Sequence, residues 1–250
     1  MADPAIVERA IGLRRELHRR PEPAWREFFT TARLVQELRD LGGDELFVGD
    51  EAIDPTIRTE LPTAEQFDEW RQRAIDAGAD AAVVEGLADG RTGLIAVIER
   101  GPGPVVGLRV DIDGLFQDEA TTADHEPAAQ GFRSKHDGVM HACGHDVHAS
   151  IGVGVIETIL QSDFSGTLKV CFQPAEEAIS GGRPLAAGGH LDDVEYLFAL
   201  HLGLGHPTGT VVAGVEGFLA VANLAVTCEG ESAHAGGHSE QGRNAIQALG

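Results

Sequence analysis

The stretch DVHASIGVGVIETILQSDFSGTLKVCF, residues 146–172, joins a helix-forming segment to a strand-forming one. Residues 146–161 are predicted as a helix. Residues 167–172 form a short run of large apolar and β-branched side chains, and a glycine and a proline lie close to its two ends. Bounded runs of this kind are typical of buried strands.

Three further runs of the same kind occur, so that the predicted strands span residues 93–98, 105–110, 167–172 and 196–200. Residues 5–41 are predicted as helical, with an interruption at two prolines, because their apolar side chains recur at three- and four-residue spacing. Since helices and strands alternate along the chain, we predict an α/β fold with a mostly parallel sheet flanked by helices.

The chain is predicted to contain one domain and part of another. Residues 44–90 are polar and acidic, include a helical stretch near 63–77, and are interpreted as an insertion. A new pattern starts after residue 217, so we expect a first domain over 1–217 and an incomplete second one over 218–250. Because the last residue falls inside an apparent helix start, we expect a fragment or one part of a split gene; a frayed natural terminus is the alternative.

The charge balance excludes several classes of partner. Acidic residues number 40 and basic residues 19, which gives a formal net charge of -21. A surface this negative repels phosphate backbones and anionic lipids, so we expect neither nucleic-acid nor membrane partners. Only Lys135 and Lys169 are lysines, and we favour a halophilic origin over an ordinary acidic enzyme, with carboxylates that repel each other less in salt.

The cellular compartment is predicted from the apolar stretches, the first residues and the cysteines of the sequence. No stretch approaches the ~20 apolar residues of a membrane span, and the first residues do not resemble a signal peptide. The three cysteines are few and odd in number, which disfavours a disulfide framework. We therefore expect a cytoplasmic protein.

A dense histidine run points to metal. Residues 140–148 read MHACGHDVH, with three imidazoles and one thiol in an irregular loop before the predicted helix. This ligand set suits zinc, or manganese once carboxylates join it. Cys143 and His145 alternate, so in extended backbone they would share one face. A lone histidine is usually a satisfied polar group, but this density is hard to explain by core packing.

Further metal-competent residues follow three of the predicted strands. Glu176 and Glu177 come after 167–172, His201 comes directly after 196–200, and the acidic pair at 111 and 113 follows 105–110. In open α/β sheets ligands bind at the carboxyl ends of strands, so one carboxylate can ligate a metal while its neighbour acts as a general base. The alternative is a solvated Glu-Glu pair, which is common on surfaces.

Five motifs in order carry a resemblance to a known family. They are RVDID at 109–113, MHACGHD at 140–146, QPAEE at 173–177, ALH at 199–201 and ESAHAG at 231–236. Together they resemble the M20 metallopeptidase family, in its amidohydrolase branch with aminoacylase, hippurate hydrolase and indole-acetyl-amino-acid hydrolases. The 44–90 segment is similar to an extra segment of p-aminobenzoyl-glutamate hydrolase subunits.

The resemblance implies a two-metal catalytic α/β domain with an inserted α+β lid domain, begun here at 218–250. The lid mediates dimerisation, so a homodimer or a dimer of related subunits is expected. The two divalent ions would be zinc or manganese, and the family takes a further histidine ligand from a segment after the lid. The implied roles are bridging ligand for Cys143, ligands for His145, Glu177 and His201, general base for Glu176, ligand-orienting groups for Asp111 and Asp113, and substrate binding for His234.

The expected function is metal-dependent hydrolysis of the amide bond in N-acyl or N-aroyl amino acids, including p-aminobenzoyl-glutamate-like substrates. Glu176 would take a proton from the attacking water and return it to the leaving amine, while His234 and the metals would stabilise the oxyanion. The alternative is a truncated, non-catalytic metal-binding subunit or pseudo-enzyme of the same family.

Overall fold

A five-stranded sheet forms the centre of the computed structural model, which describes residues 3–203, 205–217, 224, 226–234 and 236–248. The strand order is β1-β2-β4-β3-β5. The strands are β1 (Glu45–Val48), β2 (Leu94–Arg100), β3 (Val105–Asp111), β4 (Gly166–Gln173) and β5 (Tyr196–Ala199). The four strands expected from apolar runs are confirmed to within two residues at each end, and the α/β fold is confirmed with them.

The sheet is mixed rather than mostly parallel. Strands β3, β4 and β5 run parallel to one another, whereas β2 is antiparallel to both β4 and β1. The reason lies in the link between β2 and β3, residues 101–104, which read GPGP. Two parallel strands need a crossover of a dozen or more residues, so this short turn forces β2 and β3 to run in opposite directions.

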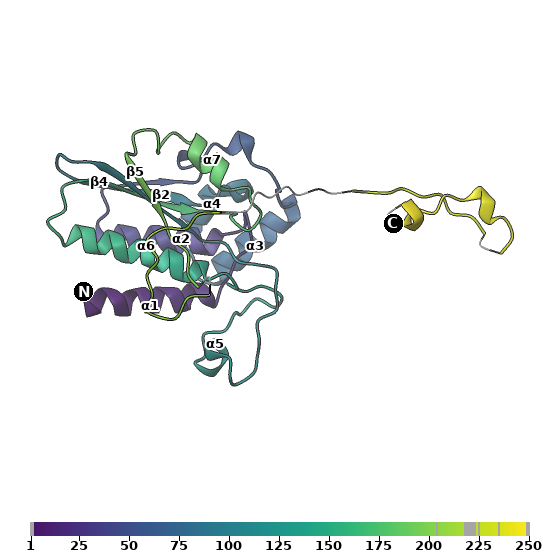
Figure 1. The fold of residues 1–250 in the computed structure, drawn as a ribbon, viewed down its shortest axis with the longest axis horizontal. Helices are drawn as coiled ribbons and strands as arrows, with labels where there is room; N and C mark the ends of the chain where they lie inside the picture. The colour runs from purple at the N-terminus through teal and green to yellow at the C-terminus, as the bar shows by residue number, and fades with distance from the viewer. Residues whose placement is uncertain (1–2, 204, 218–223, 225, 235, 249–250) are drawn as a thin grey trace. The chain divides into compact units, whose positions relative to one another are not determined.

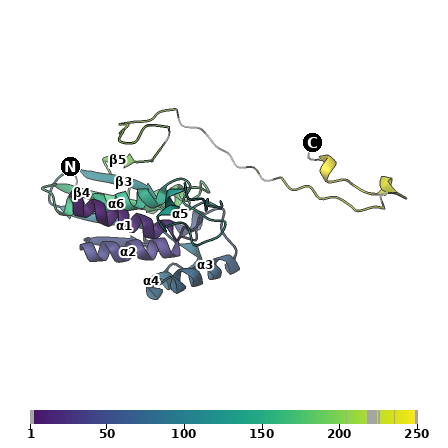
Figure 2. The ribbon, with the colours of Figure 1, turned by 90° about the horizontal axis from the view of Figure 1, so that it is seen from below.

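Helices α1 (Pro4–His18), α2 (Phe28–Leu41) and α6 (His145–Leu160) lie side by side along the sheet (Figures 1 and 2). Gly152 allows α6 to approach the strands closely, because a Cβ there would lie 2.9 Å from Phe172 and 3.1 Å from Val110. The shorter helices are α3 (Ala64–Asp76), α4 (Ala81–Gly86), α5 (Glu126–Ala129) and α7 (Gly182–Ala187). Single 3-10 turns occupy Gly49–Glu51, Pro55–Ile57, Ala88–Gly90, Ser239–Gln241 and Ile246–Ala248.

Residues 44–90 pack into the main layer. Strand β1 pairs with β2, and the Phe67 and Trp70 side chains of α3 join the hydrophobic core. Helix α3 begins with a capping box between Thr63 and Gln66, which explains where the predicted helix starts. The interpretation of this segment as an insertion stays a prediction, but its side chains are part of the core.

The chain forms two compact units, Met1–Leu204 and Gly205–Gly250. In the second unit a bridge joins Glu231 to Arg243, and the start of the new pattern expected after residue 217 lies largely outside the described residues. The expected domain boundary after residue 217 stays a prediction.

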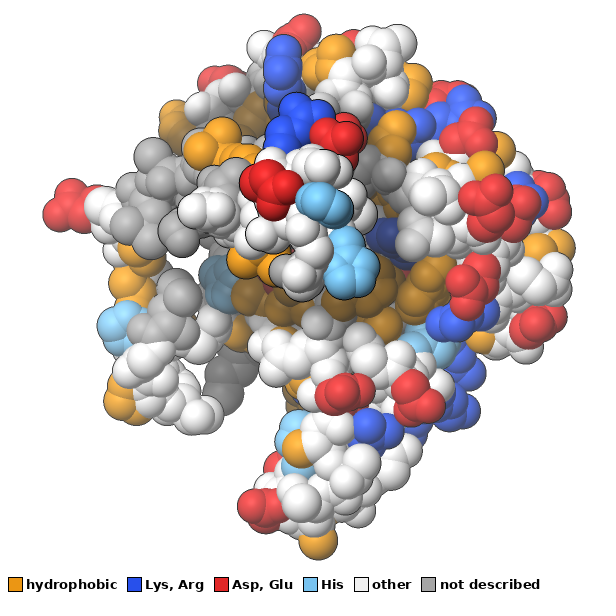
Figure 3. Space-filling view, turned by 90° about the vertical axis from the view of Figure 1, so that its right-hand side faces the viewer, with side chains coloured by type: hydrophobic (Ala, Val, Ile, Leu, Met, Phe, Trp, Pro, Cys, Tyr) orange, Lys and Arg blue, Asp and Glu red, His pale blue; other side chains and the backbone are white. Residues whose placement is uncertain are grey.

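The described helices and the surface charge relate to the expectations about compartment and partners. No helix in the described ranges is long and apolar enough to cross a membrane. Figure 3 shows acidic side chains distributed over the visible face, several of them beside basic ones, rather than gathered in one patch.

Candidate metal centre

The predicted site residues converge at one edge of the sheet. Because β3, β4 and β5 are parallel, their carboxyl ends meet there. Asp111 is the last residue of β3, Glu176 and Glu177 follow β4, and His201 follows β5. Helix α6 begins at His145, so the histidine run expected to bind metal faces the same edge.

Backbone conformations at two places direct these side chains toward the same edge of the sheet. Gly144 adopts a left-handed conformation with φ 81° and forms the N-cap of α6, so the extended backbone expected for Cys143 and His145 is wrong. Their ligand atoms still come together, because the chain turns between them. After β4, Ala175 has φ 50°, and a Cβ at Gly181 would lie 1.7 Å from the Pro174 carbonyl oxygen, which requires glycine there.

His145 lies at the centre of the cluster. Its Nε2 atom is 3.5 Å from Asp111 Oδ1, and it is 3.8 Å and 3.7 Å from carboxylate oxygens of Glu176 and Glu177. Cys143 Sγ lies 3.4 Å from His201 Nε2. Two overlapping groups of potential metal ligands result, each with its ligand atoms within 4.8 Å of one another. Cys143, His145 and His201 form one, and His145, Glu176 and Glu177 form the other.

The hydrogen bonding of the buried ligand atoms is a further reason why these residues fit a metal. His145 Nδ1 faces Asp113 Oδ1 at 3.2 Å, which directs the Nε2 lone pair into the cluster. His145 Nε2 and Glu177 Oε1 are buried and have no hydrogen-bond partner among the described residues. Buried polar atoms are nearly always paired, so two unpaired ligand atoms within reach of each other are what a cation would satisfy.

The protonation of the metal-free site reflects burial and crowded negative charge. Burial raises the pKa of the Cys143 thiol to about 12, and the charges of Glu177 and Glu176 add to this. Burial also raises the pKa of Glu177, with further contributions from Asp113 and Glu176. Burial would lower the pKa of His145, but its hydrogen bond to Asp113 and the surrounding carboxylates outweigh it and raise that pKa. A bound cation would favour loss of these protons.

The motifs predict no role for two buried residues near the cluster, Glu27 and His148. Glu27 Oε1 accepts a hydrogen bond of 2.8 Å from the Ala175 backbone N–H, and the Thr92 hydroxyl donates to its Oε2 at 2.6 Å. His148 belongs to the histidine run but receives no role from it. No sequence signal marks Glu27, because a glutamate at a helix start is usually solvated, whereas the position of His148 one turn after His145 could have indicated His148.

His148 meets Asp111 and His145 in a third group of potential ligands, but its ring nitrogens are occupied. Nδ1 lies 2.5 Å from Asp111 Oδ1, and Nε2 accepts a 3.0 Å hydrogen bond from the Leu202 backbone N–H. His148 therefore has no lone pair free for a metal.

His234 lies in the second unit, where it is exposed and its Nδ1 accepts a 3.2 Å hydrogen bond from Gly236 N–H. Its substrate-binding role stays a prediction.

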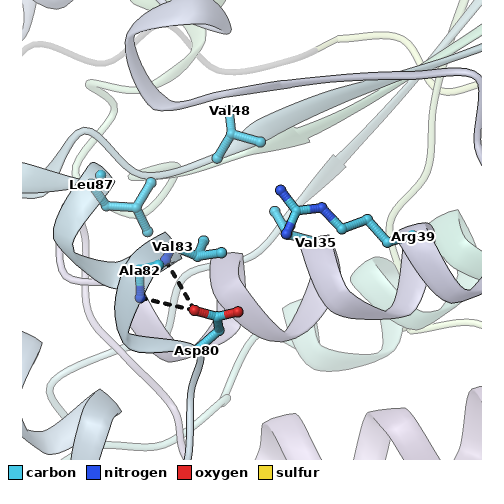
Figure 4. A pocket seen from close by; sticks show the side chains of 8 residues that line it. Val35, Arg39, Val48, Asp80, Ala82, Val83 and Leu87 are labelled. Atoms are coloured by element: carbon cyan, nitrogen blue, oxygen red, sulfur yellow. Dashed lines mark hydrogen bonds between the residues drawn. The ribbon is translucent and has the colours of Figure 1, made fainter.

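Several clefts lie away from these residues. One of about 270 Å³ is bounded by α2, β1 and α4 (Figure 4). Asp80 there accepts hydrogen bonds from Ala82 and Val83, so it caps α4, and Arg39 reaches in from α2. The cleft gathers no histidine or cysteine, and we place the chemistry at the sheet edge instead.

Comparisons with known proteins identify relatives of this chain. A model of peptidase family M20/M25/M40 matches residues 107–246. The chain is 41% identical to an indole-3-acetyl-aspartic acid hydrolase of Enterobacter agglomerans and 40% identical to one of the p-aminobenzoyl-glutamate hydrolase subunits of Escherichia coli. Both matches cover 94% of this chain and 54% of the relative, so the chain spans about half the length of the curated relatives it matches.

Solved structures show the same fold. The aminobenzoyl-glutamate utilization protein of Klebsiella pneumoniae matches with a TM-score of 0.73 and 30% identity, covering 98% of this chain and 56% of that one. A dinuclear metal-binding M20 peptidase of Bacillus subtilis matches with a TM-score of 0.55 and 30% identity, covering 80% and 44%. From its motifs, its fold and these matches, the chain belongs to peptidase family M20/M25/M40.

Proposed function

We propose that this chain carries the metal site of an amidohydrolase that cleaves N-acyl or N-aroyl amino acids. The observation that carries the proposal is the pair of buried, unpaired ligand atoms, His145 Nε2 and Glu177 Oε1, inside the cluster at the strand ends. The names of two relatives, hydrolases of indole-3-acetyl-aspartic acid and p-aminobenzoyl-glutamate, support aroyl and arylacetyl amino acids as substrates.

The residues that would hold the metal in this proposal are Cys143, His145, Glu177 and His201, and Cys143 would be shared if two ions bind. Thiolate, imidazole and carboxylate together suit zinc or manganese. When bound, such ions supply Lewis acidity, which makes water a better nucleophile and polarises an amide carbonyl. Asp113 orients His145 through its Nδ1, and Asp111 lies on the other side of the same ring.

Glu176 is the proposed general base. Its side chain is 37% exposed, against 20% for Glu177, so it reaches solvent while its neighbour faces the cluster. It would accept the proton of the attacking water and donate it to the leaving amine. His234 is the proposed contact to the substrate carbonyl, and a homodimer or related-subunit dimer through the second unit and a cytoplasmic location complete the proposal.

The alternative is a non-catalytic metal-binding subunit or pseudo-enzyme. The presence of Glu176 beside Cys143, His145, Glu177 and His201 favours the enzyme, because a metal-binding subunit has no need of a general base. Metal content and turnover, measured together, separate the two.

The test is metal content in the purified chain after loading with zinc or manganese. We expect up to two ions per chain, and fewer in Cys143→Ala. Cys171→Ala is the matched control, because Cys171 is buried in β4 outside the cluster. Equal metal content in Cys143→Ala and the parent chain would contradict the ligand assignment. Hydrolysis of p-aminobenzoyl-glutamate or indole-3-acetyl-aspartate by the loaded chain supports the enzyme, and metal binding without turnover supports the alternative.

A further inference from the structure

His201 follows the least supported strand of the site. Strand β5 is at the edge of the sheet and pairs with β3 alone. Its Tyr196, Leu197 and Phe198 side chains are each 58% exposed. A strand with both faces uncovered cannot by itself fix the direction of a side chain beyond its end, so the support for His201 must come from another element.

Leu202 provides the connection through its two backbone groups. Its carbonyl oxygen lies 2.8 Å from His201 Nδ1, which puts the ring proton on Nδ1 and leaves Nε2 with a lone pair facing Cys143. Its N–H donates to His148 Nε2 at 3.0 Å. The peptide groups of one residue therefore orient His201 and tie it to α6.

His148 is suited to hold this segment. It is fully buried on α6, and its ring centroid lies 4.7 Å from that of His201. Because Nε2 accepts the Leu202 N–H, the proton must be on Nδ1, which donates to Asp111 Oδ1 at 2.5 Å. A series of hydrogen bonds thus links Asp111, at the end of β3, to Leu202, which lies shortly after β5.

We propose that His148 is a positioning residue for His201, acting through the main chain of Leu202. The proposal rests on the proposed function, in which His201 is a metal ligand. His148 touches neither metal nor substrate in this role, since both of its nitrogens are already bonded.

Two amide substitutions separate the two hydrogen bonds of His148. In His148→Gln the longer side chain places an acceptor near the position of Nε2, so the Leu202 contact can be kept. In His148→Asn the shorter side chain places a donor near the position of Nδ1, so only the Asp111 contact can be kept. Rescue by Gln but not by Asn is the signature of positioning through Leu202, because loss of a packed ring affects both variants.

The first measurement is metal affinity, obtained by competition with a chromophoric chelator for zinc. Loss of a residue that orients a ligand typically costs ~10–100-fold in affinity, which we expect for His148→Asn and not for His148→Gln. His136→Asn is the matched control: His136 bonds Pro21 O through Nδ1, packs against Trp70 and contacts no site residue. It should leave affinity unchanged.

The second measurement needs no metal. Hydrogen exchange of the Leu202 amide in the metal-free chain should be ~2–10-fold faster in His148→Asn than in the parent, from the net worth of one hydrogen bond, and near parental in His148→Gln. Circular dichroism checks that each variant folds. Equal affinities in the Asn and Gln variants, whether parental or reduced, would overturn the proposal.

The two proposals fail in different ways. A parent chain that binds no zinc overturns the proposed function, and with it the role of His148 in holding a ligand, even where amide exchange confirms the contact to Leu202. A parent chain that binds zinc, with unchanged affinity in His148→Asn, overturns the positioning role alone.

Discussion

The site residues that follow the central strand β4 and those that follow the edge strand β5 are positioned in different ways. After β4, Glu177 N–H donates to Asp113 Oδ2 at 2.9 Å, and Ala175 N–H donates to the buried Glu27. After β5, the main chain beside His201 is held to α6 through the hydrogen bond from Leu202 N–H to His148. Hydrogen bonds to two buried carboxylates therefore position the loop of the glutamates, whereas a histidine of α6 holds the segment that carries His201.

The centre also has a second layer of support from the link between α1 and α2. The buried Trp25 indole N–H lies 3.0 Å from Ser180 Oγ and 2.9 Å from Thr59 O. Trp25 has φ 61°, a strained conformation for a bulky residue that persists only where its surroundings hold it. The loop that presents the two glutamates is therefore braced by residues about 150 positions earlier in the chain.

The largest expected effect tests the division of labour at the centre. Glu176→Gln should keep the metal and lose turnover by ~10²–10⁴-fold, the usual contribution of proton transfer. Glu177→Gln should lose metal and turnover together, because it removes a ligand. Metal content and hydrolysis rates, compared in a form of the protein that turns over, decide this. Metal loss in Glu176→Gln with retention in Glu177→Gln would show that the roles are reversed.

A second prediction tests whether the centre depends on Glu27. Glu27→Ala leaves the Ala175 N–H and the Thr92 hydroxyl without their buried acceptor, and should lower the free energy of unfolding by about 2–4 kcal/mol. Burial raises the pKa of Glu27 to about 8 in the metal-free chain, and the charge of Asp113 adds to the shift. Glu27→Gln, the matched control, resembles the protonated side chain and should be nearly as stable as the parent at neutral pH. Equal urea midpoints for Glu27→Ala and Glu27→Gln would show that the centre does not need this acceptor.

A third prediction concerns pH at the start of α6. His18 Nδ1 lies 2.8 Å from Asp146 Oδ2, and Nε2 lies 2.9 Å from Glu119 Oε1. Burial would lower the pKa of His18, but the bonds to these carboxylates and the charge of Asp146 outweigh it and raise the pKa above 6.5. A raised histidine pKa stabilises the folded state below the unfolded value and ceases to do so as pH rises through the folded value.

His18→Gln should therefore lower the free energy of unfolding most at about pH 5.5, by roughly 1–2 kcal/mol, and by less at about pH 9. At still lower pH the loss of stability shrinks again, as the pH falls through the lowered pKa values of Asp146 and Glu119. Urea unfolding of parent and variant across this range is the measurement. A cost that is the same at pH 5.5 and pH 9 would mean that His18 stays neutral throughout.

The smallest expected effect is at the edge. Phe198→Ser should change the free energy of unfolding by less than about 0.5 kcal/mol, because the side chain is mostly exposed. It should also reduce self-association of the chain, since an uncovered apolar edge strand is a site of intermolecular pairing. Light scattering against concentration measures this. A large loss of stability would show that β5 is better packed than its exposure indicates.

The positions of the strands and most of the site could be predicted from sequence because both are local. Bounded apolar runs marked β2 to β5, and metal-competent residues directly at their ends marked the cluster. The direction of β2, the pairing of β1, and the burial of Glu27 depend on contacts between segments far apart in the chain, which periodicity does not encode. The halophilic origin favoured from the sequence follows from charge alone and stays a prediction.

The order of the strands has a consequence for how the chain folds. Strands β2 and β3 are neighbours in sequence but not in the sheet, since β4 lies between them. About 55 residues separate the end of β3 from the start of β4, or roughly 3–10 s of synthesis. During that interval β4 is not yet present to lie between β2 and β3. The turn that joins β2 and β3 is short enough for them to pair directly as a hairpin. Pro102 and Pro104 lie in that turn and lack backbone N–H groups, so they cannot donate to a hairpin ladder that extends into it.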